Sequence, residues 1–146
     1  MAKEFYQMPQ GQKIKIMKKI SLFLKKQKEI SFAYLFGSFL EKEPVTFRDI
    51  DIGIFLKPLV VDRDKTFDYE TDLAIQLSKL ISFPADHIDV KVLNNASNKF
   101  QNNIFSHGLF LFAKDINLLT SLIEETSYEA IINYEFSKQS LAELLS

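Results

Sequence analysis

Residues 35–56 read LFGSFLEKEPVTFRDIDIGIFL, and this stretch decides the fold. An apolar run ends at Gly37-Ser38, and ten residues later a second run begins with Asp49 and Asp51, one residue apart. Because side chains alternate between the two faces of a strand, both aspartates point the same way and the isoleucines beside them point into a core. Like charges side by side on a strand repel and raise each other's pKa. The pair therefore predicts a cation between the two carboxylates.

The rest of the chain alternates strand-like and helical patterns. We expect the whole chain, residues 1–146, to form a single domain with a loose N-terminal arm at 1–12 and a C-terminal helical extension at 116–146. This order predicts an α/β or α+β domain with a small mixed β-sheet flanked by helices. The expected strands are 30–36, 49–56, 87–93 and 108–112, and the expected helices are 13–28, 66–81 and two within 116–146, with 94–107 partly helical.

Composition excludes several classes of site and partner. The chain has no cysteine, so disulfides, thiolate metal sites and cysteine nucleophiles are excluded. Residues 1–29 carry eight lysines against two glutamates although the net charge is -1, which favours a charged partner surface over direct binding of nucleic acid. No apolar run approaches a membrane span and no secretory leader precedes the domain, so we expect a soluble, cytoplasmic protein with no membrane partner.

A third aspartate completes a set of carboxylates. Asp89 lies in the strand expected at 87–93, and if that strand neighbours 49–56, Asp89 lies close to Asp49 and Asp51. Three convergent carboxylates suit Mg²⁺, and two such ions can clamp a phosphoryl or nucleotidyl displacement. A strand that ends in Gly37-Ser38 before a helical turn offers backbone N–H groups and a hydroxyl to a triphosphate.

At these residues the chain resembles a known family. Leu35-Phe36-Gly37-Ser38, the ten-residue gap and Asp49-Ile50-Asp51 resemble the signature of the polymerase-β-like nucleotidyltransferases. The chain is most similar to the minimal nucleotidyltransferases (MNT), which are the antitoxin partners of HEPN-domain toxins. Ile88-Asp89-Val90 and the run 108–112 with Asp115 resemble the family's later strands, so the resemblance covers about residues 14–146.

The resemblance implies a function and a set of roles. The protein would transfer AMP from ATP to a hydroxyl, expected to be that of a tyrosine, on a cognate HEPN toxin and so act as the antitoxin. Asp49 and Asp51 would ligate two Mg²⁺ ions, and Asp89 would complete one metal site and help to deprotonate the acceptor. Gly37 and Ser38 would hold the β- and γ-phosphates.

Some positions depart from the family pattern. Leu40-Glu41-Lys42 replace an Ala-Arg-Gly segment, Lys91 replaces an apolar residue, and Arg48 replaces a small polar residue. Arg48 could restore the missing positive charge at the nucleotide. Two other functions stay open: a nucleotidyltransferase-fold binding module that neutralises its toxin by contact alone, and an adenylyltransferase for a small, antibiotic-type molecule.

Structural explanations remain beside the functional ones. Asp89 could form an ion pair with Lys91, which shares its face of the strand. Ser38 could cap the following helical turn, which is compatible with phosphate binding. His87 and His107 lack further nitrogen or thiolate ligands, so we interpret both as structural.

Overall fold

Four strands form the central sheet of the molecule. The computed structural model describes residues 5–41, 46–57 and 63–145. The strands follow the order β5-β4-β2-β6 across the sheet, and only the pair β4 and β5 is parallel, so the sheet is mixed as expected. The strand bounds are β2 (Ile30–Phe36), β4 (Ile50–Leu56), β5 (Ile88–Val92) and β6 (Leu109–Ala113).

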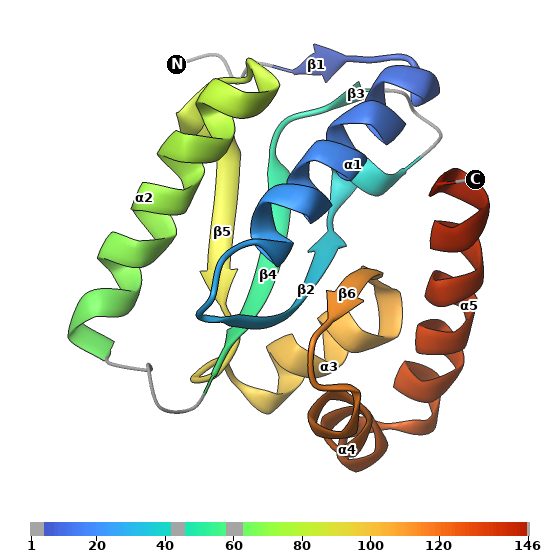
Figure 1. Ribbon diagram of the computed structural model, residues 1–146. Coiled ribbons are helices and arrows are strands. Elements are labelled where there is room, and N and C mark those ends of the chain that lie inside the picture. Colours follow the sequence, from blue (N-terminus) through green and yellow to red (C-terminus); the bar gives the residue numbers. More distant parts are fainter. Residues whose placement is uncertain (1–4, 42–45, 58–62, 146) are drawn as a thin grey trace.

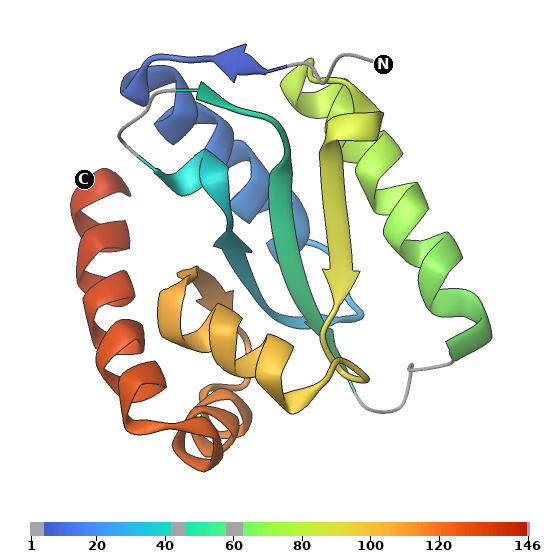
Figure 2. The same ribbon diagram turned by 180° about the vertical axis from the view of Figure 1, so that it is seen from behind.

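Helices cover both faces of this sheet. In the described part of the chain they are α1 (Gln10–Lys25), α2 (Arg63–Ile81), α3 (Asn98–His107), α4 (Ile116–Thr126) and α5 (Tyr128–Leu145). The first two lie on one face, whereas α3 lies on the other with α4 and α5 beside it (Figures 1 and 2). None of these helices is long and apolar enough to cross a membrane.

The alternation of side chains along β4 divides the core into two layers. Ile50, Ile52 and Ile54 are fully buried in the layer beneath α1 and α2. Phe55 points to the opposite face and stacks on Phe32 with a centroid distance of 4.8 Å, in the layer beneath α3 and α5. The predicted direction of the isoleucines is confirmed, and it leaves the carboxylate of Asp51 on the α3 side of the sheet.

Most predicted elements are confirmed with small shifts at their ends. The strand predicted at 30–36 has those bounds, and the described part of the predicted helical extension, residues 116–145, forms two helices that meet at Ser127. The strand predicted at 49–56 begins one residue later, so Asp49 precedes β4 instead of lying within it. The short helix α3 accounts for the partly helical pattern at 94–107.

The prediction of a loose arm at residues 1–12 is wrong over its described part. Helix α1 begins at Gln10, and a strand β1 (Tyr6–Gln7) pairs with β3 (Thr46–Phe47) in a separate two-stranded sheet. The ring of Tyr6 lies 4.6 Å from that of Phe83 and 6.0 Å from that of Phe47 between centroids. Burial of these rings fixes the segment, and a two-residue strand is too short to show a period of two in the sequence.

Candidate active site

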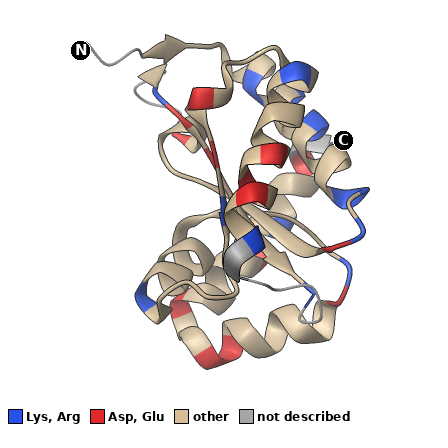
Figure 3. Cartoon of the chain, turned by 90° about the vertical axis from the view of Figure 1, so that its left-hand side faces the viewer, with Lys and Arg blue, Asp and Glu red and all other residues tan. Residues whose placement is uncertain are grey.

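The register of the parallel strands brings two predicted site residues together. Asp51 of β4 pairs directly with Asp89 of β5, and Asp49 lies two residues before Asp51 on the same side. The expectation that a neighbouring strand brings Asp89 to the aspartate pair is therefore confirmed. Figure 3, which looks at the side of α2 and β5, shows acidic segments on that helix and on the strands beside it.

Gly37 lies against the carboxylate of Asp51. Its φ is +82° and its ψ is -167°, a conformation that side chains disfavour, and a Cβ built there would overlap Oδ2 of Asp51. The chain then enters a 3-10 turn, η1 (Ser38–Leu40), in which Leu40 N–H donates to Gly37 O at 3.2 Å. Ser38 is the first residue of this turn, not its N-cap, so the capping role considered for it is wrong.

Burial and neighbouring negative charge dominate the electrostatics of Asp51. Burial is the largest cause, followed by the negative charges of Asp89 and Asp49, and together they raise the pKa of Asp51 to about 6. Arg48 and Lys91 oppose the shift without cancelling it. A carboxyl group in this setting is stabilised in its charged form by any cation that binds next to it.

The other two aspartates are turned toward cationic side chains. Arg48 donates from Nη2 to Oδ2 of Asp49 at 3.1 Å, and Nδ1 of His87 lies 3.0 Å from Oδ1 of the same carboxylate. Lys91 Nζ lies 3.7 Å from Oδ1 of Asp89, which is the ion pair considered as an alternative for this residue. Both members of that pair are about half exposed, so water screens their attraction.

The carboxylates do not form a closed metal cage in this arrangement. In residues 5–41, 46–57 and 63–145, no three His, Asp or Glu side chains converge closely enough to hold a metal ion. Asp89 is paired with Asp51 in the parallel register, and Asp49 lies two residues before Asp51, just ahead of β4. The donors are carboxylate oxygens, the ligands that hard divalent cations prefer.

His87 contacts this site although we interpreted it as structural. The sequence contained a sign of this contact. Asp49 lies two residues before Asp51, and His87 lies two residues before Asp89. In a parallel pair with Asp51 opposite Asp89, the residues two positions earlier also lie side by side. His107, by contrast, is exposed at the end of α3 and lines a different hollow, between α1, β6 and α5.

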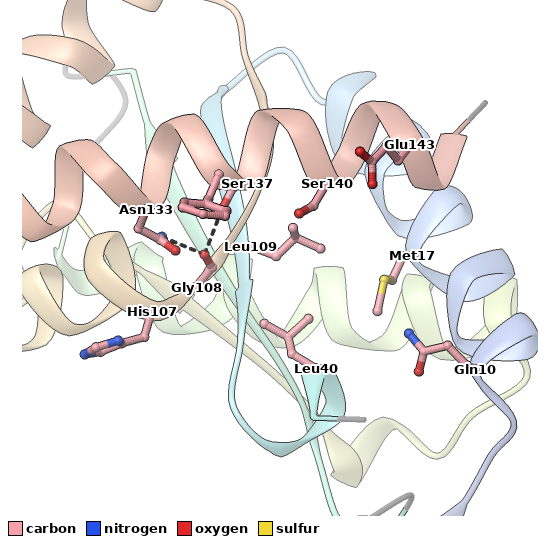
Figure 4. A pocket seen from close by; sticks show the side chains of 11 residues that line it. Gln10, Met17, Leu40, His107, Gly108, Leu109, Asn133, Ser137, Ser140 and Glu143 are labelled. Carbon is pink, nitrogen blue, oxygen red and sulfur yellow. Dashed lines mark hydrogen bonds between the residues drawn. The ribbon is translucent and has the colours of Figure 1, made fainter. Parts of the chain in front are cut away.

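Two hollows on the surface of the protein differ in their relation to the predicted site residues. A groove of about 290 Å³ between α2 and β5 is lined by Asp89 and Lys91 together with Phe67 and Ile75 of the helix. A separate cavity of about 340 Å³ between α1, β6 and α5 contains none of the predicted site residues (Figure 4). There Asn133 and Ser137 donate to Gly108 O, which anchors α5 to the start of β6.

A sheet that pairs two carboxylates beside a Gly-Ser turn is the architecture of a nucleotidyltransferase. The family model described as Polymerase beta, Nucleotidyltransferase matches residues 18–117, and the chain belongs to this family. No curated protein sequence matches the chain significantly.

Solved structures with the same fold come from toxin–antitoxin complexes. One is the MNT antitoxin complex of the tri-AMPylated HEPN toxin of Shewanella oneidensis, with a TM-score of 0.56, 18% identity, and coverage of 91% of this chain and 95% of that one. A second is a mutant of the MntA–HpeT toxin–antitoxin complex, with a TM-score of 0.52, 18% identity, and coverage of 88% and 90%. At such identities the likeness establishes the shared fold.

Proposed function

We propose that this protein is a Mg²⁺-dependent nucleotidyltransferase that transfers AMP from ATP to a tyrosine hydroxyl of a HEPN toxin and thereby acts as its antitoxin. The observation that carries the proposal is the pairing of Asp51 with Asp89 beside Gly37. This arrangement places oxygen ligands suited to a divalent cation directly beside the Gly-Ser turn.

Each site residue has a role in this reaction. Asp49 and Asp51 would hold two Mg²⁺ ions, and Asp89 would complete one of the two sites. The backbone of Gly37 and the hydroxyl of Ser38 hold the β- and γ-phosphates, and Arg48, which is 41% exposed, can move from Asp49 to the nucleotide. When bound, Mg²⁺ neutralises the phosphates and stabilises the charge that develops during displacement.

The chemical step is a displacement at the α-phosphorus of ATP. The acceptor oxygen forms a bond to this phosphorus, the bond to the β-phosphate oxygen breaks, and pyrophosphate leaves. Asp89 accepts the proton of the acceptor hydroxyl. The groove between α2 and β5 supports this assignment, because it reaches Asp89 from the outer edge of the sheet and gives an acceptor access to it.

An exposed apolar face on α5 favours a protein acceptor. Helix α5 exposes Tyr128, Ile132 and Phe136, which recur every four residues and so lie on one face. An apolar face of this kind is typical of a surface that a protein partner covers.

The proposal is tested with ATP labelled on either its α- or its γ-phosphate. The protein is incubated with Mg²⁺ and the product of the neighbouring gene, and the partner is then separated by electrophoresis. Label from the α-phosphate on the partner, with none from the γ-phosphate, is the expected result. Transfer of the γ-label, or of neither label, contradicts nucleotidyl transfer.

A second function is favoured by the ion pairs of the site. Arg48 and His87 both contact Asp49, and Lys91 pairs with Asp89, so two of the three carboxylates have partners within the protein. A protein with this arrangement could neutralise its toxin by contact alone. Toxin neutralisation by a variant with Asp49→Ala and Asp51→Ala would favour this function over AMP transfer.

A further inference from the structure

We propose that His87 is a positioning residue that fixes the carboxylate of Asp49 for metal binding, an inference that rests on the proposed function. His87 contacts Asp49 directly, and the two residues come from different elements. Asp49 precedes β4, and His87 ends the 3-10 turn η3 (Ala85–His87) that leads into β5.

The contact has the geometry of a hydrogen bond. Nδ1 of His87 lies 3.0 Å from Oδ1 of Asp49, and the side chains are 20% and 24% exposed. An ionised carboxylate can only accept hydrogen bonds, so Nδ1 carries the proton and donates it. The imidazole therefore fixes one oxygen of Asp49 and leaves the other for a different ligand.

An aromatic frame holds the imidazole in place. The ring of Tyr6 meets it edge-on at a centroid distance of 5.2 Å, and that of Phe83 does so at 6.5 Å. Tyr6 belongs to β1, whose partner β3 leads directly to Arg48 and Asp49. The two-stranded sheet thus braces the histidine, which gives a role to the segment expected to be a loose arm.

Asp49 depends on this hydrogen bond because it lies outside the strand. Its second oxygen, Oδ2, accepts from Arg48, whose side chain is 41% exposed and can move away through its own rotatable bonds. Departure of Arg48 frees Oδ2 for a cation while His87 keeps Oδ1 in place. Ligating carboxylates are commonly hydrogen-bonded by outer residues in this way, and loss of such a partner lowers metal affinity by about 10- to 100-fold.

A purely structural role predicts different behaviour. His87 N–H also donates to Pro84 O at 3.0 Å, so the residue contributes to its own turn through its backbone. If only the turn and the ring packing matter, a phenylalanine at this position keeps both. If the hydrogen bond from Nδ1 to Asp49 matters, phenylalanine at this position weakens metal binding. Asparagine restores it, because its amide nitrogen takes the place of Nδ1.

The experiment measures Mn²⁺ binding to the full chain, in place of Mg²⁺, with a non-hydrolysable ATP analogue present. Calorimetry compares the unaltered protein with His87→Phe, His87→Asn and the distant control His107→Phe, and thermal unfolding checks that each variant is folded. We expect His87→Phe to lose roughly 10- to 100-fold in Mn²⁺ affinity, and His87→Asn and His107→Phe to bind within about threefold of the unaltered protein.

The outcomes separate this inference from the proposed function. If the unaltered protein binds no Mn²⁺, the metal-dependent function and the role of His87 are both contradicted. If the unaltered protein binds Mn²⁺ and His87→Phe binds it equally well, only the role of His87 is overturned. The same holds if His87→Asn loses as much affinity as a folded His87→Phe.

Discussion

The carboxylate of Asp51 lies directly against the α-carbon of Gly37, in the space that a side chain would otherwise fill. The contact follows from the pairing of Phe36 with Asp51 across β2 and β4, one residue before the chain turns away. It means that the absence of a side chain at Gly37 and the position of Asp51 are a single structural feature. Any change at Gly37 therefore acts on the carboxylate as well as on the backbone.

Gly37→Ala should abolish AMP transfer and lower the free energy of unfolding by about 1 to 3 kcal/mol. The loss combines a positive φ, which an L side chain adopts with strain, and the overlap of the new Cβ with Oδ2 of Asp51. Gly11→Ala is the matched control, because Gly11 lies in α1 with open space around its Cβ position and should gain up to about 1 kcal/mol. Denaturant unfolding measures the stability of both variants. Equal changes in the free energy of unfolding would contradict the contact between Gly37 and Asp51.

Asp51→Asn should increase stability at neutral pH when divalent cations are removed by a chelator. The pKa of Asp51 is about 6 in the folded protein against an ordinary value of 3.8, so the folded state holds a proton that the unfolded state releases between these values. The contribution of Asp51 to stability therefore falls as pH rises from 3.8 to 6, and it stays low above pH 6.

The asparagine variant removes this pH dependence. At pH 7.5 it should exceed the unaltered protein by about 1 to 2 kcal/mol, a value reduced for solvent screening because the carboxyl group is partly exposed. Below pH 4 the difference should vanish. Denaturant unfolding at the two pH values measures it, and a variant that is less stable at pH 7.5 would show that the carboxylate is not destabilised in the fold.

Tyr34→Phe should leave the fold intact and raise the free energy of unfolding by about 1 kcal/mol. The ring of Tyr34 is fully buried, and its hydroxyl has no hydrogen-bond partner among the described residues. Burial raises the pKa of this phenol strongly, and an unpaired buried hydroxyl costs free energy. Tyr69→Phe is the control, because it loses a hydrogen bond to Glu29 and should be slightly less stable. A less stable Tyr34→Phe would mean that its hydroxyl has a partner.

Asn94→Asp should lower the free energy of unfolding by about 1 to 3 kcal/mol. The side-chain amide of Asn94 accepts from Leu56 N–H and donates to Leu56 O, both at 2.8 Å, and so extends the contact between β4 and the chain after β5. A carboxylate keeps the first hydrogen bond, but it loses the second and repels the carbonyl. Asn95→Asp is the control, because Asn95 is the exposed neighbour of Asn94. Chemical unfolding measures the stability of both variants, and equal losses would contradict the bridging role of Asn94.

The strands could be predicted from the sequence because their patterns are unambiguous. The isoleucines of β4 alternate with polar and small residues, and the run at 30–36 has the length of a buried strand. The partnership of Asp51 with Asp89 followed from their places in neighbouring strands. Gly37 was expected to let a phosphate approach the backbone, whereas the structure places the carboxylate of Asp51 in the space of the missing side chain.

The missed features depend on contacts that a local pattern does not encode. Strand β1 has two residues, and the rings of Phe47 and Phe83, which are distant in sequence, help to hold Tyr6 in place. Lys13 reads as a solvated lysine of a basic helix. In the structure it is buried, with Nζ 3.1 Å from Glu41 O and above the rings of Phe39 and Phe47. Burial lowers its pKa, and no periodicity could have shown that.

The intact mass of the partner protein tests the central claim most directly. The product of the neighbouring gene is incubated with ATP, Mg²⁺ and either the unaltered protein or a folded variant with Asp49→Ala and Asp51→Ala, and the partner is then weighed by mass spectrometry. We predict a gain of one or more adenylyl groups with the unaltered protein and none with the variant or with a chelator present. A partner whose mass does not change, or that gains the same adduct from the double variant, would contradict AMP transfer by these aspartates.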